Sequence, residues 1–91
     1  MSNVARKVRV IGRVQGVFLR AWAADEAREI GVSGWIRNSP DGSVEAHVEG
    51  DEDAVRHMIA RLRQGPPGAR VDELEMEVAE PEDLDGFEVR H

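Results

Sequence analysis

The spacing of apolar residues changes repeatedly along the chain between the period of a strand and that of a helix. The order of these changes limits the possible folds. Apolar residues at every second position predict strands at residues 7–11, 44–49, 73–78 and, in a short last piece, 87–89. The segment 32–38, Val-Ser-Gly-Trp-Ile-Arg-Asn, is also interpreted as a strand. Apolar residues three and four positions apart predict two helices, at residues 19–30 and 51–63. The predicted order is therefore β-α-β-β-α-β, with one further short strand at the end.

This order is the ferredoxin-like split βαβ arrangement of the α+β class. We expect one antiparallel sheet with two helices on one face. The 91 residues suit a single domain over residues 1–91. A sheet covered by one helix layer is the natural way for so short a chain to bury a core. Leu19 and Trp22, on the apolar side of the first helix, are expected to lie in that core.

Turn residues and charges mark the ends of these elements. Gly31 follows the first helix, and glycine is common where helices end. Residues 39–42, Ser-Pro-Asp-Gly, predict a turn that joins the second and third strands into a hairpin. Residues 51–53, Asp-Glu-Asp, place acids at the positive end of the second helix. We interpret them as helix-terminal charges rather than metal ligands, and residues 65–68, Gly-Pro-Pro-Gly, end that helix.

Composition and charge exclude several classes of protein. The chain has no cysteine, which excludes a disulfide scaffold, a cysteine zinc site and a cysteine nucleophile. The net charge of −6 argues against a general nucleic-acid binder. No apolar run reaches membrane length and no signal peptide precedes the first strand, so we expect a cytoplasmic protein without a membrane partner. Residues 1–24 contain basic residues but no acid, which suits the local binding of a small anion.

The segment 12–20 joins the first strand to the first helix and reads Gly-Arg-Val-Gln-Gly-Val-Phe-Leu-Arg. Glycine adopts backbone angles that other residues avoid. A helix N-terminus presents unpaired N–H groups that attract phosphate. Arg20 would add a planar cation suited to two phosphate oxygens. The segment therefore fits a phosphate cradle, and the alternative is a simple turn followed by a solvated arginine.

Two segments resemble the two characteristic motifs of the acylphosphatase family. The first is the segment 12–20, and the second is 34–45, Gly-Trp-Ile-Arg-Asn-Ser-Pro-Asp-Gly-Ser-Val-Glu. They occur in the family's order and at about the expected separation. The resemblance covers nearly the whole chain and is weakest after Gly68. One departure is Leu19, because the family usually has an aromatic residue before the motif arginine; here the aromatic Phe18 stands one position earlier.

The resemblance implies an enzyme, an acylphosphatase. Such an enzyme hydrolyses the carboxyl-phosphate anhydride of acyl phosphates to a carboxylate and inorganic phosphate by direct attack of water. Carried over by residue, Arg20 would bind the phosphoryl group and Asn38 would hold the attacking water. The backbone N–H groups that would assist Arg20 are those of Gln15, Gly16, Val17, Phe18 and Leu19. The resemblance implies a small-molecule substrate, no metal and no cofactor.

This reaction does not require a side chain that acts as a general acid. The leaving group is a carboxylate, whose parent acid has a pKa of about 4, so it departs without a proton. Phosphoryl transfer needs mainly positioning and charge stabilisation, which N–H donors, an arginine and a neutral amide supply. Without the resemblance, Asn38 would be interpreted as a strand-end or turn residue. Arg37 is interpreted as a solvated strand residue rather than a second anion contact.

We interpret the remaining charged residues as surface groups. His47 alternates with acids on the outer side of its strand and is expected to be exposed, as are His57 and His91. No histidine has a partner at metal-ligand spacing. The acids at 73, 75 and 77 form one exposed strand face, and residues 80–85 are a solvated loop without the glycine or spacing of an EF-hand.

Two other functions compete with the enzyme. One is a non-catalytic small-anion (phosphate) binding or regulatory module of the same fold, such as the acylphosphatase-like domains inside larger enzymes. The chain begins at Met1 and ends just after its last strand, which favours a free-standing enzyme, and a monomer is the default expectation. The other is an RNA-binding ferredoxin-like domain, which needs exposed aromatic residues on its sheet. The chain has only two Phe, two Trp and no Tyr, which disfavours RNA binding.

Overall fold

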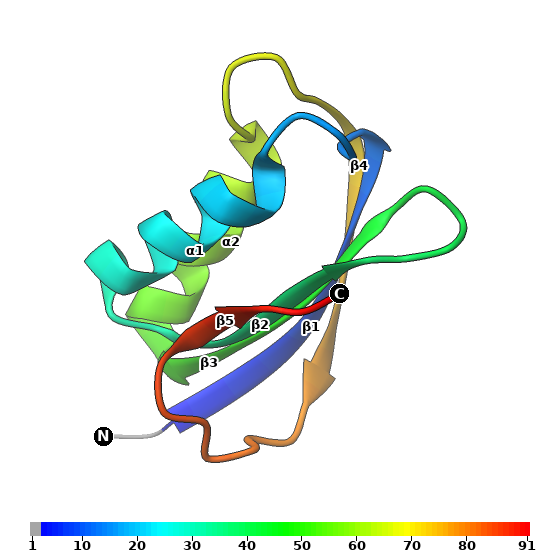
Figure 1. The fold of residues 1–91 in the computed structure, drawn as a ribbon. Helices are drawn as coiled ribbons and strands as arrows, with labels where there is room; N and C mark the ends of the chain where they lie inside the picture. The colour runs from blue at the N-terminus through cyan, green and yellow to red at the C-terminus, as the bar shows by residue number, and fades with distance from the viewer. Residues whose placement is uncertain (1–2) are drawn as a thin grey trace.

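The computed structural model describes residues 3–91. This range forms seven elements: β1 (Asn3–Arg13), α1 (Leu19–Ile30), β2 (Ser33–Asn38), β3 (Val44–Asp51), α2 (Glu52–Gln64), β4 (Arg70–Ala79) and β5 (Phe87–Val89). Their order is the predicted one, and β1 and β4 extend further than their apolar alternation indicates. Figure 1 shows the two helices packed side by side on one face of the sheet.

The strands form one five-stranded sheet in the order β4-β1-β3-β2-β5. β1 pairs antiparallel with β3 and with β4, and β2 pairs antiparallel with β3, as predicted. β5 instead pairs in parallel with β2, so the sheet is mixed rather than wholly antiparallel. The reason is the connection 80–86, which carries the chain from β4 at one edge to β5 at the other before it runs back along β2 (Figure 1).

The core lies between the helices and the sheet. Each helix turns one apolar stripe inward, as its spacing predicts. The buried helical residues are Leu19, Ala23, Ala24 and Ala27 of α1 and Val55, Met58, Ile59 and Leu62 of α2. They meet alternate strand residues that are fully buried, among them Val8, Val10, Ile36, Val44 and Val48. Leu19 is part of this core as predicted, and Trp22 packs against it while partly exposed.

The opposite face of the sheet corrects one prediction, the exposure of His47. That side chain is only 2% exposed, and its neighbour Glu49 is 4% exposed. Glu49 accepts hydrogen bonds from the backbone N–H groups of Glu82 (2.8 Å) and Leu84 (3.3 Å). The connection 80–86 therefore covers this part of the sheet. Alternation within one strand cannot reveal such a cover, because the covering residues come from more than 30 positions away.

Candidate active site

The segment 12–20 contains two glycines with different structural roles, Gly12 near the end of β1 and Gly16 in the loop that follows. Gly12 has a φ of 141°, and a side chain there would overlap the carbonyl oxygen of Arg70, 2.2 Å from the position of a Cβ atom. Gly12 therefore allows β1 and β4 to approach at their register shift. Gly16 has a φ of 75° and open space around it. Of the two, only Gly16 belongs to the open part of the loop.

The N-terminus of α1 lacks the usual protein partners. Its first flanking residue, Phe18, provides no side-chain cap, and the first turn contains no acidic residue. In the part of the chain that the structure describes, no N–H group of residues 15–19 donates a hydrogen bond to a turn carbonyl or a side chain. Unpaired N–H groups and the positive end of the helix dipole together favour an anion at this place.

Arg20 lies in the first turn of α1. Its Nη1 atom is 3.1 Å from Nδ1 of His91 and 3.4 Å from the carbonyl oxygen of Arg90, just beyond β5. These contacts hold the guanidinium beside the C-terminal segment. Among residues 3–91, Arg20 has no carboxylate within ion-pair distance, whereas nine ion pairs of other arginines occur. Its positive charge is therefore left for a ligand.

Asn38 is the last residue of β2, where it pairs with Val44 of β3. Its side-chain oxygen, Oδ1, is buried and has no hydrogen-bond partner in the structure. A buried polar atom without a partner is costly, so it needs either a function or a ligand to satisfy it. Oδ1 is an acceptor, and a water molecule would complete its hydrogen bonding.

These groups meet in a hollow of about 340 Å³. Arg20, Asn38, Gly16, Phe18 and Leu19 all contribute to its lining. Gln15 and Val17, which were predicted to contribute N–H groups, lie in the same loop but outside this lining. The structure thus brings the two predicted catalytic side chains together from α1 and β2, as the resemblance implied.

The side chain of Gln15 has a role that sequence reasoning missed. Its Nε2 donates hydrogen bonds to the carbonyl oxygens of Ser39 and Ser43, both at 2.9 Å. It therefore ties the loop to the turn that begins directly after Asn38. No local signal indicates this contact, since its partners lie 24 and 28 residues further along the chain.

The turn itself is fixed by its own hydrogen bonds. Asp41 accepts from the hydroxyl (2.6 Å) and the N–H group (2.9 Å) of Ser43. Those hydrogen bonds, with the nearby charge of Arg9, hold the pKa of Asp41 below its usual value despite some desolvation. The predicted turn at residues 39–42 is thus confirmed, and it is rigid at the point where Asn38 is positioned.

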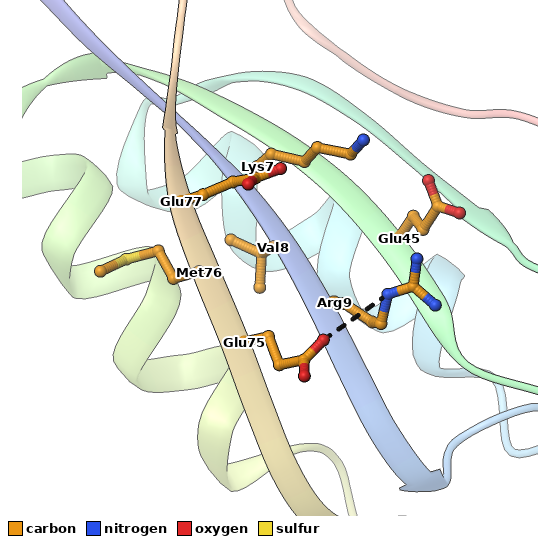
Figure 2. A pocket seen from close by; sticks show the side chains of 7 residues that line it. All are labelled: Lys7, Val8, Arg9, Glu45, Glu75, Met76 and Glu77. Atoms are coloured by element: carbon orange, nitrogen blue, oxygen red, sulfur yellow. Dashed lines mark ion pairs between the residues drawn. The ribbon is translucent and has the colours of Figure 1, made fainter.

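A larger hollow, of about 450 Å³, lies on the sheet face opposite the helices and differs in its electrostatics. Figure 2 shows the basic side chains Lys7 and Arg9 lying among Glu45, Glu75 and Glu77. Arg9 forms ion pairs with Glu75 (3.8 Å) and with Asp41. The exposure predicted for residues 73, 75 and 77 is confirmed. Since these carboxylates neutralise the basic groups, this hollow is a poor anion site.

Residues 3–91 contain neither a cluster of metal ligands nor a membrane-spanning helix. No group of three or more histidine or acidic side chains is placed as metal ligands would be. No helix is both long enough and apolar enough to cross a membrane.

Comparisons with known proteins identify the family of the chain. A family model described as Acylphosphatase matches residues 6–89. The chain is 51% identical over 89 residues to an acylphosphatase of Thermococcus kodakarensis, covering 98% of both chains. It is 52% identical over 90 residues to an acylphosphatase of Anaeromyxobacter dehalogenans, covering 98% of this chain and 97% of the relative.

A solved structure of an acylphosphatase from Coxiella burnetii has the same fold, with a TM-score of 0.92 and 35% identity. The match covers 97% of this chain and 93% of that one. Sequence and fold thus agree, and the chain belongs to the acylphosphatase family.

Proposed function

We propose that Arg20 and the adjacent N–H groups hold the phosphoryl group of an acyl phosphate while Asn38 holds the water that attacks it. The activity itself, hydrolysis of acyl phosphates, is that of the family. The observation that carries the residue assignment is the buried, unpartnered Oδ1 of Asn38, a residue that lines the same hollow as Arg20.

The phosphoryl group would lie at the N-terminus of α1. Gly16, Phe18 and Leu19 line the hollow here, and Arg20 adds the charge. Donors already in position stabilise charge that develops on the equatorial oxygens without reorganising during the reaction. We retain the N–H groups of Gln15 and Val17 in the proposal as neighbours in the same open loop.

The water would lie against Asn38. Oδ1 accepts a hydrogen bond from the water, which orients a lone pair of the water oxygen toward phosphorus. A bond forms between that oxygen and phosphorus, and the bond from phosphorus to the acyl oxygen breaks. The electron pair leaves with the carboxylate, which needs no proton because its parent acid has a pKa of about 4.

The proton of the water is assigned to a phosphate oxygen of the substrate. Among residues 3–91, no aspartate or glutamate lines the hollow. The ring of His91 has its Nδ1 3.1 Å from Nη1 of Arg20. The reaction therefore needs no protein general acid, and the proposal includes no metal and no cofactor.

The direct test is phosphate release from acetyl phosphate with a chelator present, for the wild type and for Asn38→Ala. We expect metal-free turnover by the wild type and a fall in kcat of about 100-fold in the variant, since one positioning group is lost. Inhibition by inorganic phosphate should change much less, because Arg20 and the loop are intact. Asn3→Ala, which alters the other asparagine of the chain, exposed at the start of β1, is the matched control.

Three outcomes are informative. Equal losses of turnover and of phosphate binding in Asn38→Ala would contradict the water-holding role. Wild-type protein that binds phosphate without turnover would instead support a non-catalytic anion-binding module. Wild-type turnover that occurs without the chelator and is lost when the chelator is added would contradict the metal-free chemistry.

We further propose that the active form is a monomeric single domain over residues 1–91 that acts on a small molecule in the cytoplasm. The single five-stranded sheet and the one core cluster support the single domain. Light scattering at micromolar concentration tests the monomer, and a stable dimer would contradict it.

A further inference from the structure

Phe18 is the most exposed of the large apolar side chains among residues 3–91. It is 85% exposed, compared with 79% for Val78 and 53% for Met76. An exposed phenyl ring gains little from packing and orders water around it. The core therefore gives no reason for an aromatic residue at this position.

The backbone at Phe18 gives no reason either. Its φ and ψ are 60° and 22°, in the left-handed region that disfavours bulky residues. Glycine would adopt these angles without strain. Nor does Phe18 cap the helix, since its side chain accepts no hydrogen bond. Two local costs are thus tolerated at one residue, and both fall next to the proposed phosphoryl site.

The ring stands at the edge of the hollow, beside the groups that bind phosphate. The lining divides into a polar part, Arg20 and Asn38, and an apolar part that includes Val14, Ala21 and Val89. With the phosphoryl group on the polar part, the rest of the substrate extends past the apolar part toward solvent. Apolar and aromatic side chains with a few polar groups are the usual lining of a small-molecule site.

We propose that Phe18 contacts the acyl group of the substrate and favours apolar, above all aromatic, acyl groups. This inference rests on the proposed function, because it takes the phosphoryl position from Arg20 and the loop. A flat aryl group stacks on the exposed ring, whereas an acetyl group is too small to cover it. Phe18 is therefore a specificity residue, and the N–H groups of its loop retain the phosphate contact.

The test compares two phosphonates in which a methylene replaces the bridging oxygen, phenacylphosphonate for benzoyl phosphate and acetonylphosphonate for acetyl phosphate. Their dissociation constants are measured by calorimetry, and hydrolysis of the two acyl phosphates is measured in parallel. Phe18→Gly should reduce the preference for the aryl over the methyl compound about five- to tenfold. Phe18→Trp should retain the preference, and inorganic phosphate, which has no acyl group, is titrated in parallel to report any change in the loop backbone.

Val78→Ala, which shortens an equally exposed side chain on β4, is the matched control and should leave the preference unchanged. An unchanged preference in Phe18→Gly overturns the inference. So does an equal loss of affinity for both phosphonates and for phosphate, because Phe18 would then act only through the loop backbone. Absent hydrolysis by the wild type would contradict the proposed function, while the phosphonate affinities still decide the role of Phe18.

Discussion

The two helices of this protein begin in opposite ways. At the start of α2, the Asp51 carboxylate accepts a hydrogen bond from the N–H group of Asp53, and Glu52 and Asp53 lie in the first turn. At the start of α1 there is neither a side-chain cap nor an acid. Both helices have the same positive end. The positive end of α2 is neutralised by the chain itself, whereas that of α1 is left open beside Arg20.

Two polar side chains of the hairpin β2–β3 show the same contrast. Glu49 is buried, but three donors satisfy its carboxylate: His47, and the N–H groups of Glu82 and Leu84. The Oδ1 of Asn38 is also buried and has no partner. Where the polar groups are paired within the chain they stabilise the fold, and where they are unpaired they mark the place of a ligand.

The largest effect is expected for Arg20→Lys. Lysine keeps the charge but loses the planar fork that binds two phosphate oxygens. We expect kcat/KM for acetyl phosphate to fall about 10³-fold, and inhibition by inorganic phosphate to weaken, with the fold intact. Arg13→Lys, the same change at an exposed arginine just before the loop, is the control. Near-normal turnover of Arg20→Lys would contradict the cradle assignment.

The next largest effect is expected for Glu49, whose carboxylate is paired within the chain. Glu49→Gln removes the charge that three donors share, which should lower the free energy of unfolding by about 2 kcal/mol at pH 7. Burial by itself raises the pKa of Glu49, but the hydrogen bonds from Glu82, His47 and Leu84 outweigh it and lower that pKa below its ordinary value. The stabilisation by Glu49 is therefore present above its unfolded pKa and is lost as the pH falls through the folded one.

Urea unfolding from pH 7 down to pH 3 measures this dependence. The difference between wild type and Glu49→Gln should shrink below the ordinary glutamate pKa of about 4.5. Glu77→Gln, on the exposed face of β4, should show almost no difference at any pH. A difference that persists unchanged in acid would show that the charge of Glu49 is not the stabilising feature.

A smaller effect is expected when α1 is given the acid that α2 already has. Ala21→Asp adds a carboxylate to the exposed first turn at the edge of the hollow. The carboxylate competes with phosphate for the same positive charge, so the affinity for inorganic phosphate should fall about tenfold. Ala21→Asn, of the same shape without the charge, is the control. Unchanged phosphate affinity in Ala21→Asp would place the anion elsewhere.

The smallest effect is expected at the other helix. Asp51→Ala removes the cap of α2 and should lower the free energy of unfolding by about 1 kcal/mol without changing turnover. Asp51→Asn keeps a capping side chain and should restore most of the stability. A loss of turnover in the alanine variant at a temperature where the protein stays folded would contradict the claim that the start of α2 serves stability alone.

The order of the elements could be predicted because each rests on local periodicity. The core positions of Leu19 and Met58 follow from helical spacing, and those of Val44 and Val48 from alternation. The burial of His47 could not be predicted, because its cover comes from the connection 80–86. Nor could the parallel pairing of β5, since strand periodicity contains no information about direction.

The candidate site divides in the same way. The resemblance indicated Arg20 and Asn38, and the structure places both at one hollow. The side chain of Gln15 and the contact of His91 with Arg20 depend on residues far away in the sequence, so neither was predicted. From the sequence, Phe18 is only an aromatic neighbour of Leu19. Its solvent exposure could not be predicted, because it depends on the folded loop.

The most direct test of the contrast between the helices is a titration of the protein with inorganic phosphate, followed by the NMR signals of the backbone amides. The amides of Gln15 to Arg20 should shift most, and those of residues 52–54 at the start of α2 should stay in place. Shifts concentrated at α2, or spread evenly over the basic residues of the surface, would contradict the claim that the open N-terminus of α1 is the anion site.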